Sequence, residues 1–352
     1  MNSTERPGVY SEWDASSVIT ARAGARGIGA VGLSQKGEMG RVVMITRLSQ
    51  ALEAFGEDTS GLYAMIKVAL QAGAAHVQAV GIPKTSAALE DYTQGFALLG
   101  QKEDVPFVIC DSIELNIQQA LRNAVNEASG ARRERMGLVG LNTDTVETLT
   151  ARADNLQSER MLLVGPRITD SGGNVMSGHM AAAVLAGVLA SETDPALPIG
   201  GAVLPGAYGV SAQYTDSEVD LLIAGGVTPL EVIAGQVIVI RGITTRTKTA
   251  GVLDATWKDL STIRIADYVI PTLRRSLKVK FARAKNTAQV RGAIKSLVVM
   301  ELEQMKSDQI ISGYEGIAVE QSAEQPTVCI VTFSFRVAHT LNQIRLTAHI
   351  LV

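Results

Sequence analysis

Three closely spaced glycines form the clearest chemical motif of the sequence. Gly27, Gly29 and Gly32 match the G-x-G-x-x-G spacing of dinucleotide-binding loops, in which a strand precedes the glycines and the next helix holds a pyrophosphate at its amino terminus. Here the glycines lie within an apolar, strand-like run, and the following residues, SQKGEMG, carry no helical pattern. This context favours a strand followed by a glycine-rich loop. An α/β oxidoreductase that binds NAD(P) through Gly27–Gly32 is kept as the alternative function.

Other residue types that could do chemistry are scattered along the chain. The segment Asp170–Gly173 and the residue His76 have the residue types found around the serine and histidine of chymotrypsin-like proteases. Those proteases are all-β, whereas these residues lie in predicted β-α units. The two cysteines, Cys110 and Cys329, lie far apart in apolar runs, and no two histidines have the spacing of a local metal site. We therefore expect no catalytic residue, no metal and no cofactor.

The elements that must position any such residues follow an α/β pattern. From about residue 41 to 165, short apolar runs alternate with segments of helical period, which is typical of repeated β-α units. The expected strands are Val42–Ile45, His76–Val80, Phe107–Cys110, Met136–Val139 and Met161–Val164. The expected helices are 61–72, 113–128 and 178–191. The fold class predicted from this order is α/β, with α+β character overall.

The chain changes style after a passage rich in proline and glycine, Leu197–Val210, which is the best candidate for a domain boundary. A short helix near 217–224 and two strands within 231–240 are expected next, followed by two long helices near 261–284 and 287–306. The last nine residues alternate between apolar and polar, with Ile344, Leu346, Ala348, Ile350 and Val352 on one face. A similar alternation runs through 331–337. A chain that ends in an apolar strand needs a partner for it, either its own sheet or another subunit.

Charge is distributed unevenly along the chain. The whole chain has a net charge of -3, whereas residues 241–296 contain thirteen Lys and Arg against three Asp. Such segregation indicates an acidic partner. Aromatic residues make up only 4% of the chain, so a protein partner is favoured over nucleic acid, which stays as a rival. The polar residues 1–14 do not resemble a signal peptide, and no stretch of 18 apolar residues occurs, so we expect a soluble product made in the cytoplasm.

Three segments carry a resemblance to a known family. The opening RPGVYSEWDASS, Arg6–Ser17, resembles the amino terminus of contractile tail sheath proteins, which occur in bacteriophages, phage-tail-like bacteriocins and related injection systems. The segment Asp216–Lys248 is similar to that family's succession of a short helix, a Gly-Val turn, a strand and an Arg-Thr-rich strand. The segment Asp259–Thr287 resembles the long helix that follows.

The resemblance implies an inner α/β domain made from both chain ends, an inserted outer β-α domain, and extended strand arms at both termini. We expect an N-terminal arm at 1–24, an outer domain at 25–205, an inner tube-facing domain at 206–325 and a C-terminal strand arm at 326–352. The arms would exchange strands with neighbouring subunits. The residues expected in these contacts are Val9, Tyr10, Ile344, Leu346, Ile350 and Val352.

The resemblance also implies a structural subunit and not an enzyme. Copies would polymerise as stacked hexameric rings around an inner tube and contract to drive that tube through a target cell envelope. The implied partners are other copies, the tube protein, and baseplate and tail terminator proteins, without nucleic acid or direct membrane insertion. The residues expected to face the tube are Arg274, Arg275, Lys278, Lys280 and Arg283. Assembly is expected in the bacterial cytoplasm, followed by release as part of a phage tail, tailocin or injection particle.

Overall fold

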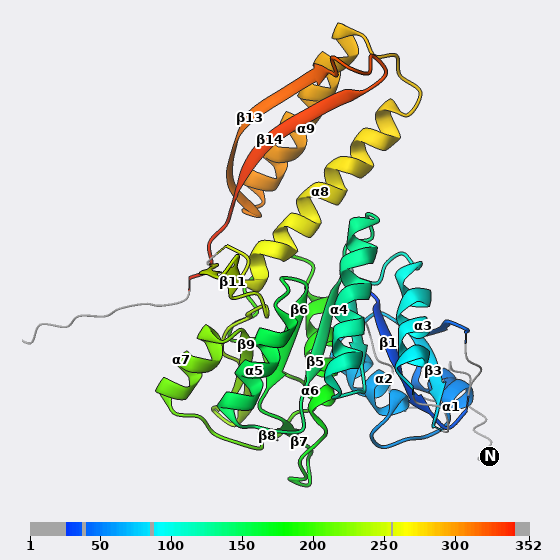
Figure 1. Ribbon diagram of the computed structural model, residues 1–352, viewed down its shortest axis with the longest axis vertical. Coiled ribbons are helices and arrows are strands. Elements are labelled where there is room, and N and C mark those ends of the chain that lie inside the picture. The colour runs from blue at the N-terminus through cyan, green and yellow to red at the C-terminus, as the bar shows by residue number, and fades with distance from the viewer. Residues whose placement is uncertain (1–25, 37–39, 85–87, 255, 342–352) are drawn as a thin grey trace, which may run out of the picture.

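A computed structural model of the chain describes residues 26–36, 40–84, 88–254 and 256–341 (Figure 1). An eight-stranded sheet forms the centre, in the order β10-β9-β6-β5-β4-β1-β3-β2. The strands are β1 (Ile28–Ser34), β2 (Val43–Ile45), β3 (Val77–Pro83), β4 (Phe107–Cys110), β5 (Met136–Gly140), β6 (Met161–Gly165), β9 (Val227–Ile233) and β10 (Gln236–Val239). The inner strands are parallel, and the edge strands β2 and β10 pair antiparallel. The sheet is therefore doubly wound, because the chain builds outward from β1 in both directions.

Helices cover both faces of the sheet. One face carries α1 (Leu48–Phe55), α2 (Leu62–Gln71) and α6 (Gly178–Ser191). The other face carries α3 (Leu89–Gly100), α4 (Leu115–Gly130), α5 (Val146–Leu156) and α7 (Asp216–Ala224). We call the sheet with these seven helices the body. It confirms the predicted mixed α/β class.

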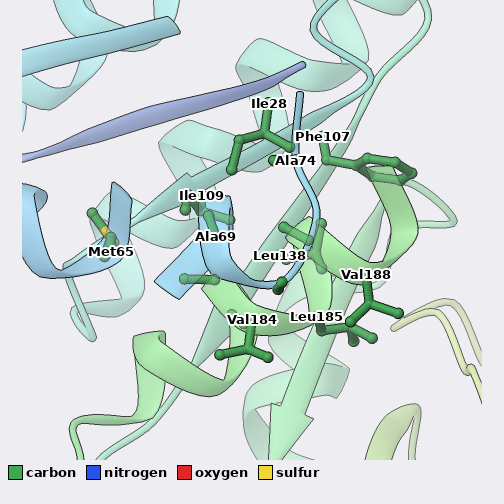
Figure 2. Close-up of a cluster of buried hydrophobic side chains, with 14 of the residues drawn as sticks. Ile28, Met65, Ala69, Ala74, Phe107, Ile109, Leu138, Val184, Leu185 and Val188 are labelled. Atoms are coloured by element: carbon green, nitrogen blue, oxygen red, sulfur yellow. The ribbon is translucent and has the colours of Figure 1, made fainter. Parts of the chain in front are cut away.

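The strands of the body are continuous apolar runs because both of their faces are buried. In β4, Phe107 and Ile109 enter one core, whereas Val108 and Cys110 enter the other. Figure 2 shows the first of these cores, where α6 lies close to α2 and the sheet. Every residue of α6 is buried. A Cβ added at Gly187 would lie 2.4 Å from a backbone oxygen of α2, so glycine permits this close approach.

Two short antiparallel ladders are separate from the central sheet: β7 (Ile168–Thr169) pairs with β8 (Gly209–Val210), and β11 (Lys248–Thr249) pairs with β12 (Val252–Leu253). A cis peptide bond joins Gly165 to Pro166.

The last described elements form a C-terminal module that stands away from the body (Figure 1). The module consists of α8 (Leu260–Phe281), α9 (Ala288–Ser307), β13 (Ile311–Gln321) and β14 (Cys329–Val337). Its core is separate from the two cores of the body and contains Val269, Leu273, Val298 and Leu302. No helix in the described part of the chain is both long and apolar enough to span a bilayer.

The expected division between residues 205 and 206 falls inside the body. Although β9 and β10 come after that point, β9 pairs with β6 and extends the central sheet. The proline- and glycine-rich passage is a loop on the body, and the change of architecture comes at α8. Similarly, β14 lies within the expected arm 326–352 but pairs with β13 of the same chain.

Candidate assembly surfaces

The three glycines of the dinucleotide motif lie at the start of β1 and within it, not in a turn between a strand and a helix. A Cβ at Gly29 would lie 2.8 Å from Val105 and 2.9 Å from Leu99, so the motif serves tight packing around a central strand. The described residues between β1 and β2 contain no helix that could hold a pyrophosphate. The oxidoreductase alternative therefore fails its structural condition.

A buried polar cluster that the sequence did not suggest lies where β1 and β4 end. Asp111 accepts hydrogen bonds from the Tyr92 hydroxyl at 2.6 Å and from the Leu33 backbone N–H at 2.6 Å. Burial raises the pKa of Asp111 and lowers the pKa of the nearby His179, whose Nε2 lies 2.9 Å from the carbonyl oxygen of Ser60. Doubly wound sheets usually bind ligands at this place. Here the polar groups bond to one another and connect the loops that follow the two strands.

The protease-like residues are not assembled into a site. His76 precedes β3 at the amino edge of the sheet, with its Nε2 3.6 Å from Asp104. Ser171 lies in the turn after β7, in which Asp170 accepts hydrogen bonds from the N–H groups of Gly172 and Asn174. Among the residues that the structure describes, no group of three or more His, Cys, Asp or Glu side chains is arranged to hold a metal ion.

The five basic residues expected to face the tube occupy three different environments. Arg274 donates to Glu134 of the body at 2.9 Å. Arg275 and Lys278 are exposed on the part of α8 that borders a cleft against the body. Lys280 and Arg283 are exposed at the end of α8 and directly after it. Only the last two lie beyond the body contacts.

The first half of α8 contacts the body through hydrogen bonds and an ion pair of largely buried charged groups. The Arg264 guanidinium donates to the carbonyl oxygens of Leu197 at 3.1 Å and Asp194 at 3.2 Å. Burial lowers its pKa to about 10. Arg160, which precedes β6, forms a two-pronged ion pair with Asp267 at 2.8 and 2.9 Å. These contacts fix the direction in which α8 leaves the body.

The β13–β14 hairpin presents unpaired edges. The alternation predicted for 331–337 is confirmed, since Val331, Phe333 and Phe335 pack against the module core and the residues between them are exposed. Each strand pairs only with the other among the described residues, so the outer backbone N–H and C=O groups of both lack a ladder partner there. Such edges are templates for a further strand.

The residues expected to exchange strands lie outside the described residues: Val9, Tyr10, Ile344, Leu346, Ile350 and Val352. The described chain ends at Leu341, four residues after β14.

Comparison with known proteins connects these surfaces to one family. Residues 85–245 match the family described as phage tail sheath protein central domain, and residues 253–350 match the phage tail sheath C-terminal domain. Among curated proteins, none matches the sequence.

Solved structures share the fold at low sequence identity. A chain of the six-fold symmetrised anti-feeding prophage baseplate has a TM-score of 0.75 and 14% identity, with 99% of this chain and 100% of that chain covered. A chain of the anti-feeding prophage helical sheath in the contracted state gives a TM-score of 0.73, 16% identity and 99% coverage of both chains. The sheath tail protein from Desulfitobacterium hafniense gives a TM-score of 0.72 and 11% identity, with 94% of this chain and 100% of that chain covered.

Proposed function

Since this chain belongs to the phage tail sheath family, we propose that its copies polymerise as stacked hexameric rings around an inner tube and contract to drive that tube through a cell envelope. The chain is a structural subunit of a contractile sheath and not an enzyme. Its relatives include chains of a baseplate and of a contracted helical sheath, which supports partnership with further copies and with baseplate proteins. A tail terminator is proposed to cap the far end of the polymer. Assembly in the bacterial cytoplasm is proposed to precede release of the finished particle.

The observation that carries the polymer proposal is the two-stranded hairpin with free edges. An isolated two-stranded ribbon is marginally stable in water. The hairpin of the C-terminal module is covered on one face by α9, but both of its edges remain open among the described residues. Strands from neighbouring copies, one containing Val9 and Tyr10 and one spanning 344–352, would complete it by β-augmentation.

The mechanism follows from these ladders and from buried area. Main-chain ladders between copies persist while the bodies rotate as rigid units, because hydrogen bonding within a ladder does not depend on the contacts of the body. Contraction would bring bodies together and remove further surface from water, at roughly 25 cal/mol for each Å² of apolar area. The extended state is then metastable, and its free energy is stored when the polymer forms.

Contact with the tube is proposed for the basic residues of α8. Lys280 and Arg283 suit this role best because they are exposed and form no ion pair with any described residue. Weak, screened contacts suit a bond that must be released during contraction. Arg275 and Lys278 are also proposed to contact the tube, and in addition they border the cleft between α8 and the body.

Substitutions on the two faces of the last strand test the exchange of arms. Leu346→Lys with Ile350→Lys places charge on the apolar face, and Thr347→Lys with His349→Lys places the same charge on the polar face. We expect the first pair to abolish cylinders in negative-stain micrographs and fast-sedimenting polymers, and the second pair to retain them. Cylinders formed equally well by both variants would refute strand exchange through this segment.

A further inference from the structure

A cleft of about 830 Å³ separates the middle of α8 from the amino edge of the central sheet. Its walls come from the loop before β4, the loop between α4 and β5, and the exposed side of α8. Five of the basic residues on its wall are Lys102, Arg132, Arg133, Arg275 and Lys278. We call this site the basic cleft.

Basic residues outnumber acidic ones on the wall of the basic cleft, eight Lys and Arg against Glu103, Asp104, Glu134 and Asp267, and two of these four acids are neutralised within the chain. Glu134 is paired with Arg274, and Asp267 with Arg160. By contrast, none of the five basic residues named for the cleft forms an ion pair with a described residue.

Arg133 adds a second sign of an absent partner. Its Nε is buried and has no hydrogen-bond partner among the described residues. A buried polar atom without a partner carries a desolvation penalty, which a bound acidic group can remove. The basic cleft therefore suits an acidic ligand that can reach between α8 and the sheet.

The chain itself carries a complementary surface on α7. Residues 211–240 contain four acidic residues and no Lys, Arg or His. Asp216 and Asp220 are exposed on α7 and form no ion pair with any described residue. Leu221 beside them is 58% exposed. The basic cleft matches this combination, because Tyr268 and Pro271 supply apolar surface among its basic groups.

The topology keeps these two surfaces of one chain apart. The helix α7 ends just before β9 begins, so its last turn lies at the amino edge of the sheet. Its first turn, which contains Asp216, therefore lies toward the carboxyl edge. The basic cleft lies at the amino edge, and β6 separates β9 from β5 in the sheet. A contact between the surfaces therefore joins two different copies.

We propose that the acidic face of α7 on one sheath subunit occupies the basic cleft of a neighbouring subunit. This inference rests on the proposed polymer. Two different surfaces that complement each other make a heterologous contact, which produces rings or helical assemblies according to the rotation between copies. The contact is electrostatic, so it is weakened by salt more than the backbone ladders are.

Charge reversal on each side, followed by exchange of both, tests this pairing. The cleft variant is Arg275→Glu with Lys278→Glu, the α7 variant is Asp216→Lys with Asp220→Lys, and the exchanged variant carries all four changes. The matched control, Lys285→Glu with Lys295→Glu, makes the same charge change at exposed residues outside both the basic cleft and the residues proposed to contact the tube. The measurement is the lowest protein concentration that yields sedimenting polymer, at low and at high salt.

We expect each two-residue reversal of the proposed contact to raise this concentration by about tenfold at low salt, because an exposed charge pair contributes up to roughly fivefold and two pairs are lost at once. The exchanged variant should return close to the unmodified value, and the difference should shrink at high salt. The control should polymerise like the unmodified protein in the absence of tube.

Failure of the exchanged variant to recover, while the unmodified protein polymerises, would overturn the pairing and leave the sheath proposal intact. Recovery requires that both variants remain folded, which circular dichroism of each variant checks independently. An unmodified protein that never polymerises would refute the proposed function itself.

Discussion

Breaking the buried ion pair between the body and α8 should loosen the C-terminal module. The Arg160 and Asp267 side chains are only 14% and 17% exposed and meet through two hydrogen bonds of 2.8 and 2.9 Å. Arg160→Met keeps most of the side-chain volume but leaves the Asp267 carboxylate buried without its partner. Removing one member of such a pair is expected to destabilise the contact by about 3 kcal/mol or more. The double variant Arg160→Met with Asp267→Leu should recover most of that loss, because no buried charge remains.

Hydrogen exchange of the backbone amides of α8 measures this loss locally. Because the C-terminal module has its own core, separate from those of the body, a melting transition of the body does not report how tightly α8 is held to it. When exchange is limited by local opening, a loss of about 3 kcal/mol makes exchange roughly 150-fold faster, since each 1.4 kcal/mol is a factor of ten. The matched control, Lys248→Met, breaks an exposed pair with Asp154 whose side chains are 50% and 61% exposed. It should change exchange by less than about fivefold.

The pH dependence gives a further check on the same pair. Burial raises the pKa of Asp267, and the hydrogen bonds from Arg160 only partly offset this effect. The folded protein therefore binds a proton at Asp267 more readily than the unfolded chain does. At low pH the carboxyl group of Asp267 is neutral, so the deficit of Arg160→Met should shrink as the pH falls. Unchanged exchange in the single variant, or a double variant as unstable as the sum of both single changes, would refute the assigned role of this pair.

Two further predictions concern the body. Gly187→Ala should destabilise it by about 1–3 kcal/mol, because the new Cβ meets the backbone of α2 and α6 is buried along its whole length; a melting temperature equal to that of a Gly100→Ala control, where the added Cβ meets no atom within 4 Å, would contradict this packing argument. The pKa of Asp144 is lowered overall, since hydrogen bonds from Arg167 outweigh the effect of burial. Its ionised form therefore stabilises the fold above the ordinary carboxyl range, and this stability is lost as the pH falls through the lowered pKa. Asp144→Asn should lower the melting temperature at pH 7 and reduce its decline in acid, and a variant whose acid decline matches the unmodified chain would count against this assignment.

The buried elements of the body could be predicted closely from the sequence. The strand expected at Phe107–Cys110 and the helix expected at 178–191 have the predicted bounds. Both are bounded apolar segments, and in the helix only His179 and Ser191, near its two ends, are polar. The strand β13 was missed because two glycines and two irregularities in register interrupt its alternation.

The surfaces were less predictable than the elements because they join distant parts of the chain. A run of basic residues around α8 was visible in the sequence, but its division into three environments was not. Lys102 and Arg133 belong to loops that are more than 130 residues from Lys278 along the chain, and only the fold brings them to one cleft. The pairing of Arg274 with Glu134 likewise depends on the direction of α8, which the buried contacts of Arg264 help to fix.

The order of charges along α8 has a consequence for contraction in the proposed sheath. Charged groups in the first half of the helix are buried against the body, so salt hardly weakens them and the module must follow any rotation of the body. The exposed residues Lys280 and Arg283 lie at the other end, where contacts are screened and readily broken. A rotation of the body would then carry the end of α8 away from an acidic tube, while the hairpin keeps its ladders to neighbouring copies. The sheath could release the tube without losing its own continuity, because the contacts that break and the contacts that persist belong to opposite classes of interaction.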